Sequence, residues 1–255
     1  MIAVSSMYPD QATDYPPMVL IHGAANSAKV WTVWQQELAG RGWTSHAIDL
    51  RGHGQSPPSD LSRTTMEDYA SDVRDLAGRL SQPPVVMGWS MGGLVGMMVA
   101  SQGLGVACIA LAPSLPARQM DTSVDLRTGE FGPEEYGIID GDTNNQPTMP
   151  DLDAEERSLA LSSLSRESRL ARDQRRQGII IESLPCPLLI VTGTDDKAWP
   201  KTRYEGLWLN AEFLEVEEAS HWGLVLNRRA LAVGIPEVLR WLTTNVGPVA
   251  ETPNR

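Results

Sequence analysis

The stretch that most constrains the fold begins at residue 83 and reads PPVVMGWSMGG. Val85 to Met87 predict a short buried strand, and an apolar helix is expected from about Met91 to Ser101. Between them lies G-x-S-x-G, with Ser90 flanked by Gly88 and Gly92. Glycine at both flanks removes side chains that would collide with a serine at the apex of a sharp strand-to-helix turn. The pattern therefore predicts a strained serine at the N-terminus of a helix; an ordinary glycine-rich turn is the alternative.

Strand-like and helix-like segments alternate through the first part of the chain. Buried strands are expected at 18–21, 43–50, 85–87 and 105–111, with at most one strand near 2–5 before them. The clearest amphipathic helix runs from about Met66 to Leu80, behind a capping box formed by Thr64 and Glu67. Such alternation predicts βαβ units and a parallel sheet.

The alternation stops between Pro113 and Leu184. Residues 121–153 are acidic and rich in loop-forming residues, and 154–177 predict one or two helices. A long excursion inside a compact domain is usually a lid or disorder. We expect a core domain made of residues 1–113 and 184–255, with residues 114–183 inserted as a small cap. A solvated acidic excursion without a role is the alternative.

The sheet is expected to resume at 187–192 and to end at 212–216. A short helix is predicted over 201–210, and a terminal helix reaches to about Val246. Because Pro236 falls within that helix, we expect a break or kink near Gly234.

The composition excludes several classes of protein. The formal net charge of −11 argues against nucleic acid or an anionic membrane as a partner. No apolar run is long enough to span a membrane, and the first 17 residues lack the pattern of a secretory signal. Cys108 and Cys186 are expected to be reduced, and the protein cytoplasmic.

Groups suited to acyl transfer follow three different strands. Besides Ser90, the pair Asp195 and Asp196 follows the strand at 187–192, and His221 follows the last strand. Ends of parallel strands share one edge of a sheet, so these groups can meet there, in the order Ser, Asp, His. A histidine would take the serine proton, and a carboxylate would orient that histidine. The expected oxyanion donors are the N–H groups of Ala24 and Met91.

Five motifs then resemble the α/β-hydrolase superfamily, in particular its small serine esterase branch. They read HGAANSxxxW, DLRGHGQS, GWSMGG, GTDDKAWP and SHW. The resemblance implies an α/β-hydrolase fold, with a mostly parallel sheet of six to eight strands flanked by helices, a Ser–His–Asp triad and a cap. Within GTDDKAWP, the family pattern G-x-x-D-x-x-x-P selects Asp196 rather than Asp195 as the triad acid.

The resemblance implies hydrolysis of a carboxylic ester or lactone of a small, largely apolar molecule, through an acyl-serine. A carbon–carbon bond hydrolase and a receptor-like protein with negligible turnover are the alternatives. The pocket is expected to be lined by Trp31, Leu115, Trp199 and Trp222. No cofactor or metal is expected, and the protein is expected to be a monomer or a small homo-oligomer.

Overall fold

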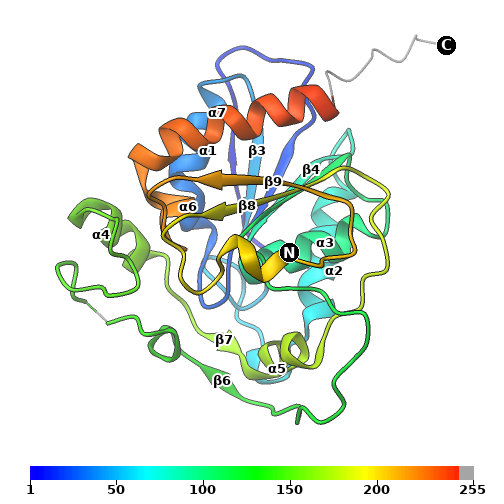
Figure 1. Ribbon diagram of the computed structural model, residues 1–255, viewed down its shortest axis with the longest axis vertical. Helices are drawn as coiled ribbons and strands as arrows, with labels where there is room; N and C mark the ends of the chain where they lie inside the picture. Colours follow the sequence, from blue (N-terminus) through cyan, green and yellow to red (C-terminus); the bar gives the residue numbers. More distant parts are fainter. Residues whose placement is uncertain (140, 247–255) are drawn as a thin grey trace.

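A seven-stranded sheet forms the centre of the molecule (Figure 1). Its strands are β1 (Val4–Met7), β2 (Met18–Ile21), β3 (Ser45–Ile48), β4 (Val85–Trp89), β5 (Ala107–Leu111), β8 (Leu188–Gly193) and β9 (Ala211–Val216). They lie in the order β1-β3-β2-β4-β5-β8-β9, and every pair is parallel except β1 with β3. This confirms the predicted sheet. The computed structural model describes residues 1–139 and 141–246, so the part of the predicted core domain beyond 246 lies outside the described residues.

Helices cover both faces of the sheet because its central strands are apolar on both sides. Along β4, Val85 and Met87 pack into one core cluster and Val86 into the other, as the period of two residues requires. The first cluster includes side chains of α1 (Thr32–Ala39), α6 (Gly223–Leu226) and α7 (Arg228–Asn245). The second includes side chains of α2 (Met66–Ala77) and α3 (Met91–Ala100). Because the central strands β2, β3, β4, β5 and β8 are buried along their whole length, their carboxyl ends are held firmly where the loops begin.

The capping box of α2 lies one residue later than predicted. The Thr65 hydroxyl accepts the Asp68 N–H, and the Asp68 carboxylate accepts the Thr65 N–H in return. Thr64 cannot play this part because its hydroxyl donates to the Asp60 carbonyl, at the end of the short 3-10 turn η2 (Leu61–Arg63). The pairing of Thr64 with Glu67 was therefore wrong.

Two predictions near the C-terminus also need correction. The helix expected over 201–210 is a single 3-10 turn, η4 (Lys201–Tyr204), because the chain turns at Gly206, where φ is 78°. The terminal helix α7 continues through Pro236 without a break near Gly234. The interruption comes earlier, at Asn227, whose side chain accepts the Ala230 N–H and starts a new helix.

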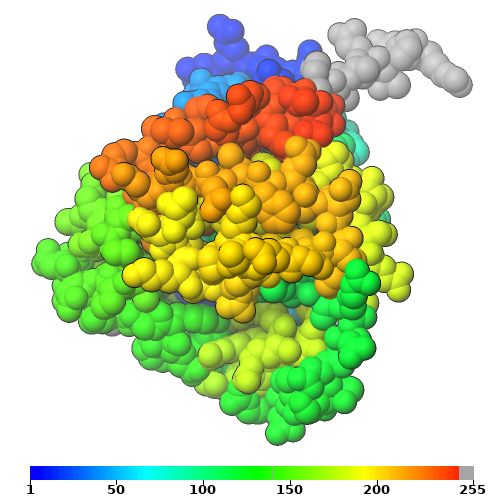
Figure 2. Space-filling view, viewed as in Figure 1, coloured from blue at the N-terminus to red at the C-terminus, as the bar shows by residue number. Residues whose placement is uncertain are grey.

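Residues 114–183 form a separate layer against one edge of the sheet (Figure 1). Their elements are β6 (Glu130–Phe131), the 3-10 turn η3 (Pro133–Tyr136), α4 (Ala154–Ser162), β7 (Glu167–Ser168) and α5 (Arg169–Gln177). Strands β6 and β7 pair antiparallel, and a bridge between Ala117 and Ile180 closes the base of the segment. Figure 2 shows the green residues of this segment covering the lower part of the molecule. We call residues 114–183 the insertion; its boundaries and its role as a cap stay predictions.

Cys108 is buried, Cys186 is half-buried, and both are free thiols. Among the described residues, no helix combines the length and the apolar character needed to cross a bilayer.

Candidate active site

Ser90 occupies a sharp turn between β4 and α3, where it is the N-cap of the helix. Its backbone has φ 56° and ψ −117°, a conformation that L-residues rarely adopt and that costs free energy. The turn leaves no room for side chains at its flanks. A Cβ at Gly88 would collide with the Gly92 carbonyl, and a Cβ at Gly92 would collide with the carbonyls of residues 21 and 22. The two glycines therefore permit the close packing that holds the serine in this strained position.

His221 and Asp196 are held together by a hydrogen bond of 2.7 Å between Nδ1 and Oδ2. The other oxygen of Asp196 accepts the N–H groups of Ala198 and Trp199, at 3.0 and 2.8 Å. Burial alone would raise the pKa of Asp196, but these bonds, led by the one to His221, hold that pKa below its ordinary value. The carboxylate is therefore ionised and fixes the orientation of the imidazole.

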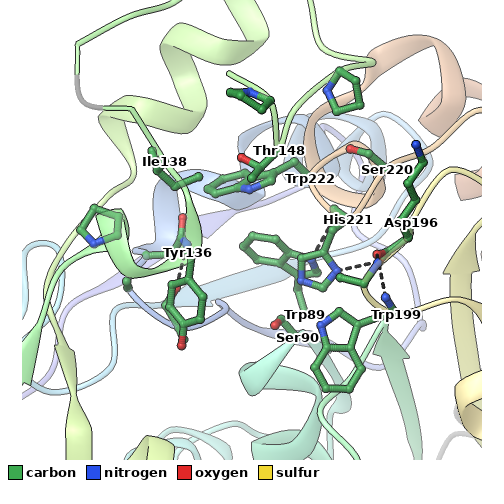
Figure 3. Close-up of a pocket in the computed structure, with 18 of the residues that line it drawn as sticks. Trp89, Ser90, Tyr136, Ile138, Thr148, Asp196, Trp199, Ser220, His221 and Trp222 are labelled. Carbon is green, nitrogen blue, oxygen red and sulfur yellow. Dashed lines mark hydrogen bonds and ion pairs between the residues drawn. The ribbon is translucent and has the colours of Figure 1, made fainter. Parts of the chain in front are cut away.

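Ser90, Asp196 and His221 all line one cavity of about 450 Å³ (Figure 3). Strand ends bring them there: Ser90 follows β4, Asp196 follows β8, and His221 follows β9. Trp89 supports the histidine loop, because its indole N–H donates to the His221 carbonyl at 3.0 Å. Among the described residues, no hydrogen bond joins the Ser90 hydroxyl to the His221 ring. The three predicted groups thus share one cavity, and two of them are directly bonded.

Of the four residues predicted to line the pocket, Trp199 and Trp222 do so. Trp31 does not: it is completely buried and packs edge-on against Trp34, with ring centroids 6.4 Å apart. Leu115 is also absent from the wall and packs against the core cluster on the α3 face of the sheet. Both predictions were therefore wrong, because these side chains pack into the core clusters instead of facing the cavity.

Ala24 and Met91 are the expected oxyanion donors. Ala24 lines the cavity, and Met91 is the first residue of α3. Among the described residues, neither N–H group has a hydrogen-bond partner. The N-terminus of α3 also carries the positive end of the helix dipole. An oxygen that becomes negative beside Ser90 could therefore be stabilised there.

A buried carboxylate from the insertion supports the loop that carries Ala24. Glu167 is completely buried, and its Oε2 accepts the Ala25 N–H at 3.1 Å. Its Oε1 accepts the Tyr69 hydroxyl at 2.5 Å, and His53 lies 3.5 Å from Oε2. Burial, the largest single influence, would raise the pKa of Glu167, but the charge and hydrogen bond of His53, the charge of Arg175 and the Tyr69 hydroxyl together outweigh it and lower that pKa to about 2. The insertion thus holds the loop beside the serine through an ionised group.

Further bonds between the insertion and this loop surround Glu167. The Ser165 N–H donates to the Ala25 carbonyl at 2.9 Å, and the Ser163 hydroxyl donates to the Asn26 side chain at 2.8 Å. Ala25 needs this support because its φ is 56°, in the left-handed region that favours glycine.

The insertion also supplies much of the cavity wall, which sequence reasoning missed. Figure 3 shows Tyr136 and Ile138 across the cavity from Asp196 and Trp199. The complete wall from the insertion consists of Pro133, Tyr136, Ile138, Pro147, Thr148, Pro150, Leu164 and Arg175. The sequence predicts helices over 154–177 but does not show which of their side chains face the cavity, and no pattern marks the wall residues between 133 and 150. Trp89, by contrast, could have been found, since it lies directly before the serine.

Comparison with protein families gives one match that covers most of the chain. The model described as "Alpha/beta hydrolase family" matches residues 18–233, which include all three predicted triad residues.

Curated relatives match a shorter part of the chain. Protein phosphatase methylesterase 1 of Homo sapiens is 35% identical over 101 residues, which are 38% of this chain and 26% of that protein. Pimeloyl-[acyl-carrier protein] methyl ester esterase of Cronobacter sakazakii is 35% identical over 103 residues, or 40% of this chain and 38% of that protein. The matches thus span well under half the length of these relatives.

Among solved structures, a carboxylesterase of Nitrososphaera gargenis has a TM-score of 0.66 at 20% identity. The alignment covers 96% of this chain and 97% of that one. At this identity the likeness concerns the fold alone.

Proposed function

Because this chain belongs to the alpha/beta hydrolase family, we propose that it is a serine hydrolase that cleaves a carboxylic ester or lactone through an acyl-serine intermediate. One observation carries the proposal: the strained Ser90 and the hydrogen-bonded pair His221–Asp196 line the same cavity. The two curated relatives described above are named as methyl esterases, which supports an ester as substrate.

In the first half of the reaction, the Ser90 oxygen attacks the ester carbonyl while His221 takes the hydroxyl proton. Asp196 holds the imidazole in the tautomer that has a free nitrogen toward the serine, and it stabilises the imidazolium that forms. The N–H groups of Ala24 and Met91 donate to the carbonyl oxygen as it becomes negative. The carbon–oxygen bond of the ester breaks, and His221 returns the proton to the departing alcohol.

In the second half, water attacks the acyl-serine. His221 takes a proton from this water, the ester bond to Ser90 breaks, and the serine regains its proton. The products are one alcohol and one carboxylic acid. No further co-reactant is needed.

The cavity favours a small substrate with an apolar body. Its wall combines apolar side chains of the insertion with Trp199 and Trp222 of the core. We propose that the insertion is a cap that selects the substrate, because it forms the side of the cavity opposite Asp196.

The test is turnover of short p-nitrophenyl esters, with a methyl ester and a lactone in the same panel. The wild-type protein is expected to hydrolyse them and to show a burst of nitrophenol as the acyl-serine accumulates. Ser90→Ala should lose nearly all turnover, and a serine-directed phosphonate should label the wild type at Ser90 alone.

A folded wild type that hydrolyses none of the esters or lactones would contradict the proposal. Cleavage of a β-diketone without esterase activity would indicate a carbon–carbon hydrolase instead. Binding of ligands without any turnover would indicate a receptor-like protein.

A further inference from the structure

Helix α5 carries four arginines, and one of them differs from the others. Arg169 and Arg172 pair with Glu135, and Arg176 pairs with Asp173. Arg175 forms no ion pair within 4.0 Å in the part of the chain that the structure describes. It is also the one arginine of α5 that lines the cavity containing Ser90 and His221. The charge of Arg175 is therefore left without a direct partner at the place where substrate would lie.

The hydrogen bonds of Arg175 are few and long. Its guanidinium lies 3.4 Å from the Ser114 hydroxyl and 3.3 Å from the Tyr136 hydroxyl, and both of these groups are neutral. Its Nε is buried and has no partner among the described residues. A guanidinium has five N–H donors and binds carboxylates best through two parallel hydrogen bonds. Two long contacts to neutral hydroxyls leave most of this capacity unused.

Glu167 is the carboxylate that interacts with Arg175 through space, since Arg175 helps to lower its pKa. The oxygens of Glu167 are already occupied by the Tyr69 hydroxyl and by the N–H groups of Ala25 and Ser168. Glu167 therefore weakens the electrostatic attraction that Arg175 exerts on an anion, but it accepts no hydrogen bond from the N–H groups of Arg175.

Arg175 lies near the nucleophile. Ser114, which its guanidinium contacts, donates its backbone N–H to the Ser90 carbonyl at 3.0 Å. The other cation in the wall, Lys197, is exposed and lies next to Asp196. An anionic group on the substrate would thus find its best partner on the insertion side of the cavity, away from Asp196.

We propose that Arg175 binds a carboxylate carried by the substrate, so that the natural substrate class is an ester of an acid with a second, anionic group. The remaining wall from the insertion, including Ile138 and Leu164, would contact the apolar chain between the two groups. This inference rests on the proposed esterase function. A protein with a net charge of −11 repels anions in general, so a local cation such as the half-buried Arg175 is needed to bind one.

The test compares pairs of esters that differ in one charge. Monomethyl esters of succinic, glutaric and adipic acid are each paired with the neutral methyl ester of the monocarboxylic acid of equal chain length. The wild type should prefer the charged member of at least one pair, measured as the ratio of the two kcat/KM values. Arg175→Gln should lower that ratio about 10- to 100-fold, mainly through KM. Arg175→Lys should restore part of it.

Arg176→Gln is the matched control, because it removes the same charge from the next residue of the same helix, which does not line the cavity. It should leave the ratio unchanged. Arg175→Gln would overturn the inference if it left the ratio intact, or if it lowered both members of each pair equally. A loss of the preference in Lys197→Gln alone would also overturn it.

The two proposals fail in different ways. If wild type hydrolyses neutral esters but does not prefer charged ones, the anion site is wrong and the esterase function stands. If wild type hydrolyses no member of any pair, the proposed function itself fails.

Discussion

His221 Nδ1 lies 2.7 Å from an oxygen of Asp196, whereas the neighbouring Asp195 forms no hydrogen bond with this ring among the described residues. Adjacent residues after a strand point in different directions, so only one of the two can face the histidine. Asp195 is exposed and is tied to the Ala219 carbonyl by its backbone N–H. This relationship separates two carboxylates that the sequence places side by side.

Asp196→Asn should therefore lower kcat by about 10³- to 10⁴-fold, because an amide in this place favours the wrong histidine tautomer. Asp195→Asn, the matched control, should lose less than about tenfold. Both variants are measured on one p-nitrophenyl ester, with circular dichroism to show that they fold. The opposite ranking in two folded variants would assign the acid to Asp195.

Glu167→Gln should lower kcat by about tenfold or more and change KM little, because the charge that fixes Ala25 beside the oxyanion site is removed. The affinity for a trifluoromethyl ketone, which forms a negative oxygen on the serine, should fall in parallel. Glu130→Gln is the control: this carboxylate lies in the paired strand β6 but is partly exposed and bonds to Arg166. A loss of thermal stability with unchanged kcat and ketone affinity would show that Glu167 is only structural.

The free energy of unfolding should be highest near pH 6.5. Burial lowers the pKa of His22 to about 4, so stability rises with pH between about 4 and 6.5 as the unfolded chain loses its proton. For His53, burial acts to lower the pKa, but Glu167 raises it above the ordinary 6.5. His53 therefore makes its full contribution to the free energy of unfolding below pH 6.5, and this contribution is lost as the pH rises through the raised pKa of His53.

Urea unfolding between pH 5 and 9 measures both the rise of the free energy of unfolding toward pH 6.5 and its fall above pH 6.5. Asp49 also acts on the pKa of both histidines, and Tyr69 and Arg175 act on the pKa of Glu167. The fall in the free energy of unfolding above pH 6.5 nevertheless depends on the charge of Glu167. Glu167→Gln should flatten that fall, since His53 then loses its counter-charge. An equal fall in the variant and the wild type would contradict this assignment.

Ile138→Ala should shift the preference among neutral p-nitrophenyl esters toward longer acyl chains, because it enlarges the insertion side of the cavity. The expected change in the ratio of kcat/KM between long and short esters is about 3- to 10-fold. Ile139→Ala is the control, because this neighbour is 39% exposed and absent from the wall. If Ile138→Ala affected all esters equally, the insertion would support the fold without selecting substrate.

The sequence by itself determined the features of the fold that depend on neighbouring residues in the chain, namely the turn at Ser90 and the succession of strands and helices. Glycine at 88 and 92 predicts the tight turn at Ser90 because only glycine fits there, and alternating apolar segments predict the parallel sheet. Ends of parallel strands share an edge, so the approach of His221 to a carboxylate after β8 also followed from the order of elements.

The tertiary structure alone decided which side chains complete the cavity. Glu167 and Arg175 belong to the insertion, where the helices predicted over 154–177 do not show which side chains face the core domain, and their roles come from contacts with Ala25 and with the cavity wall. Glu167 and Arg175 were not predicted as site residues. Trp31, by contrast, was predicted to line the pocket, but its side chain packs into the core. The physical reason is common to both: local pattern sets backbone conformation, whereas the direction and partners of a side chain depend on how the folded chain packs around it.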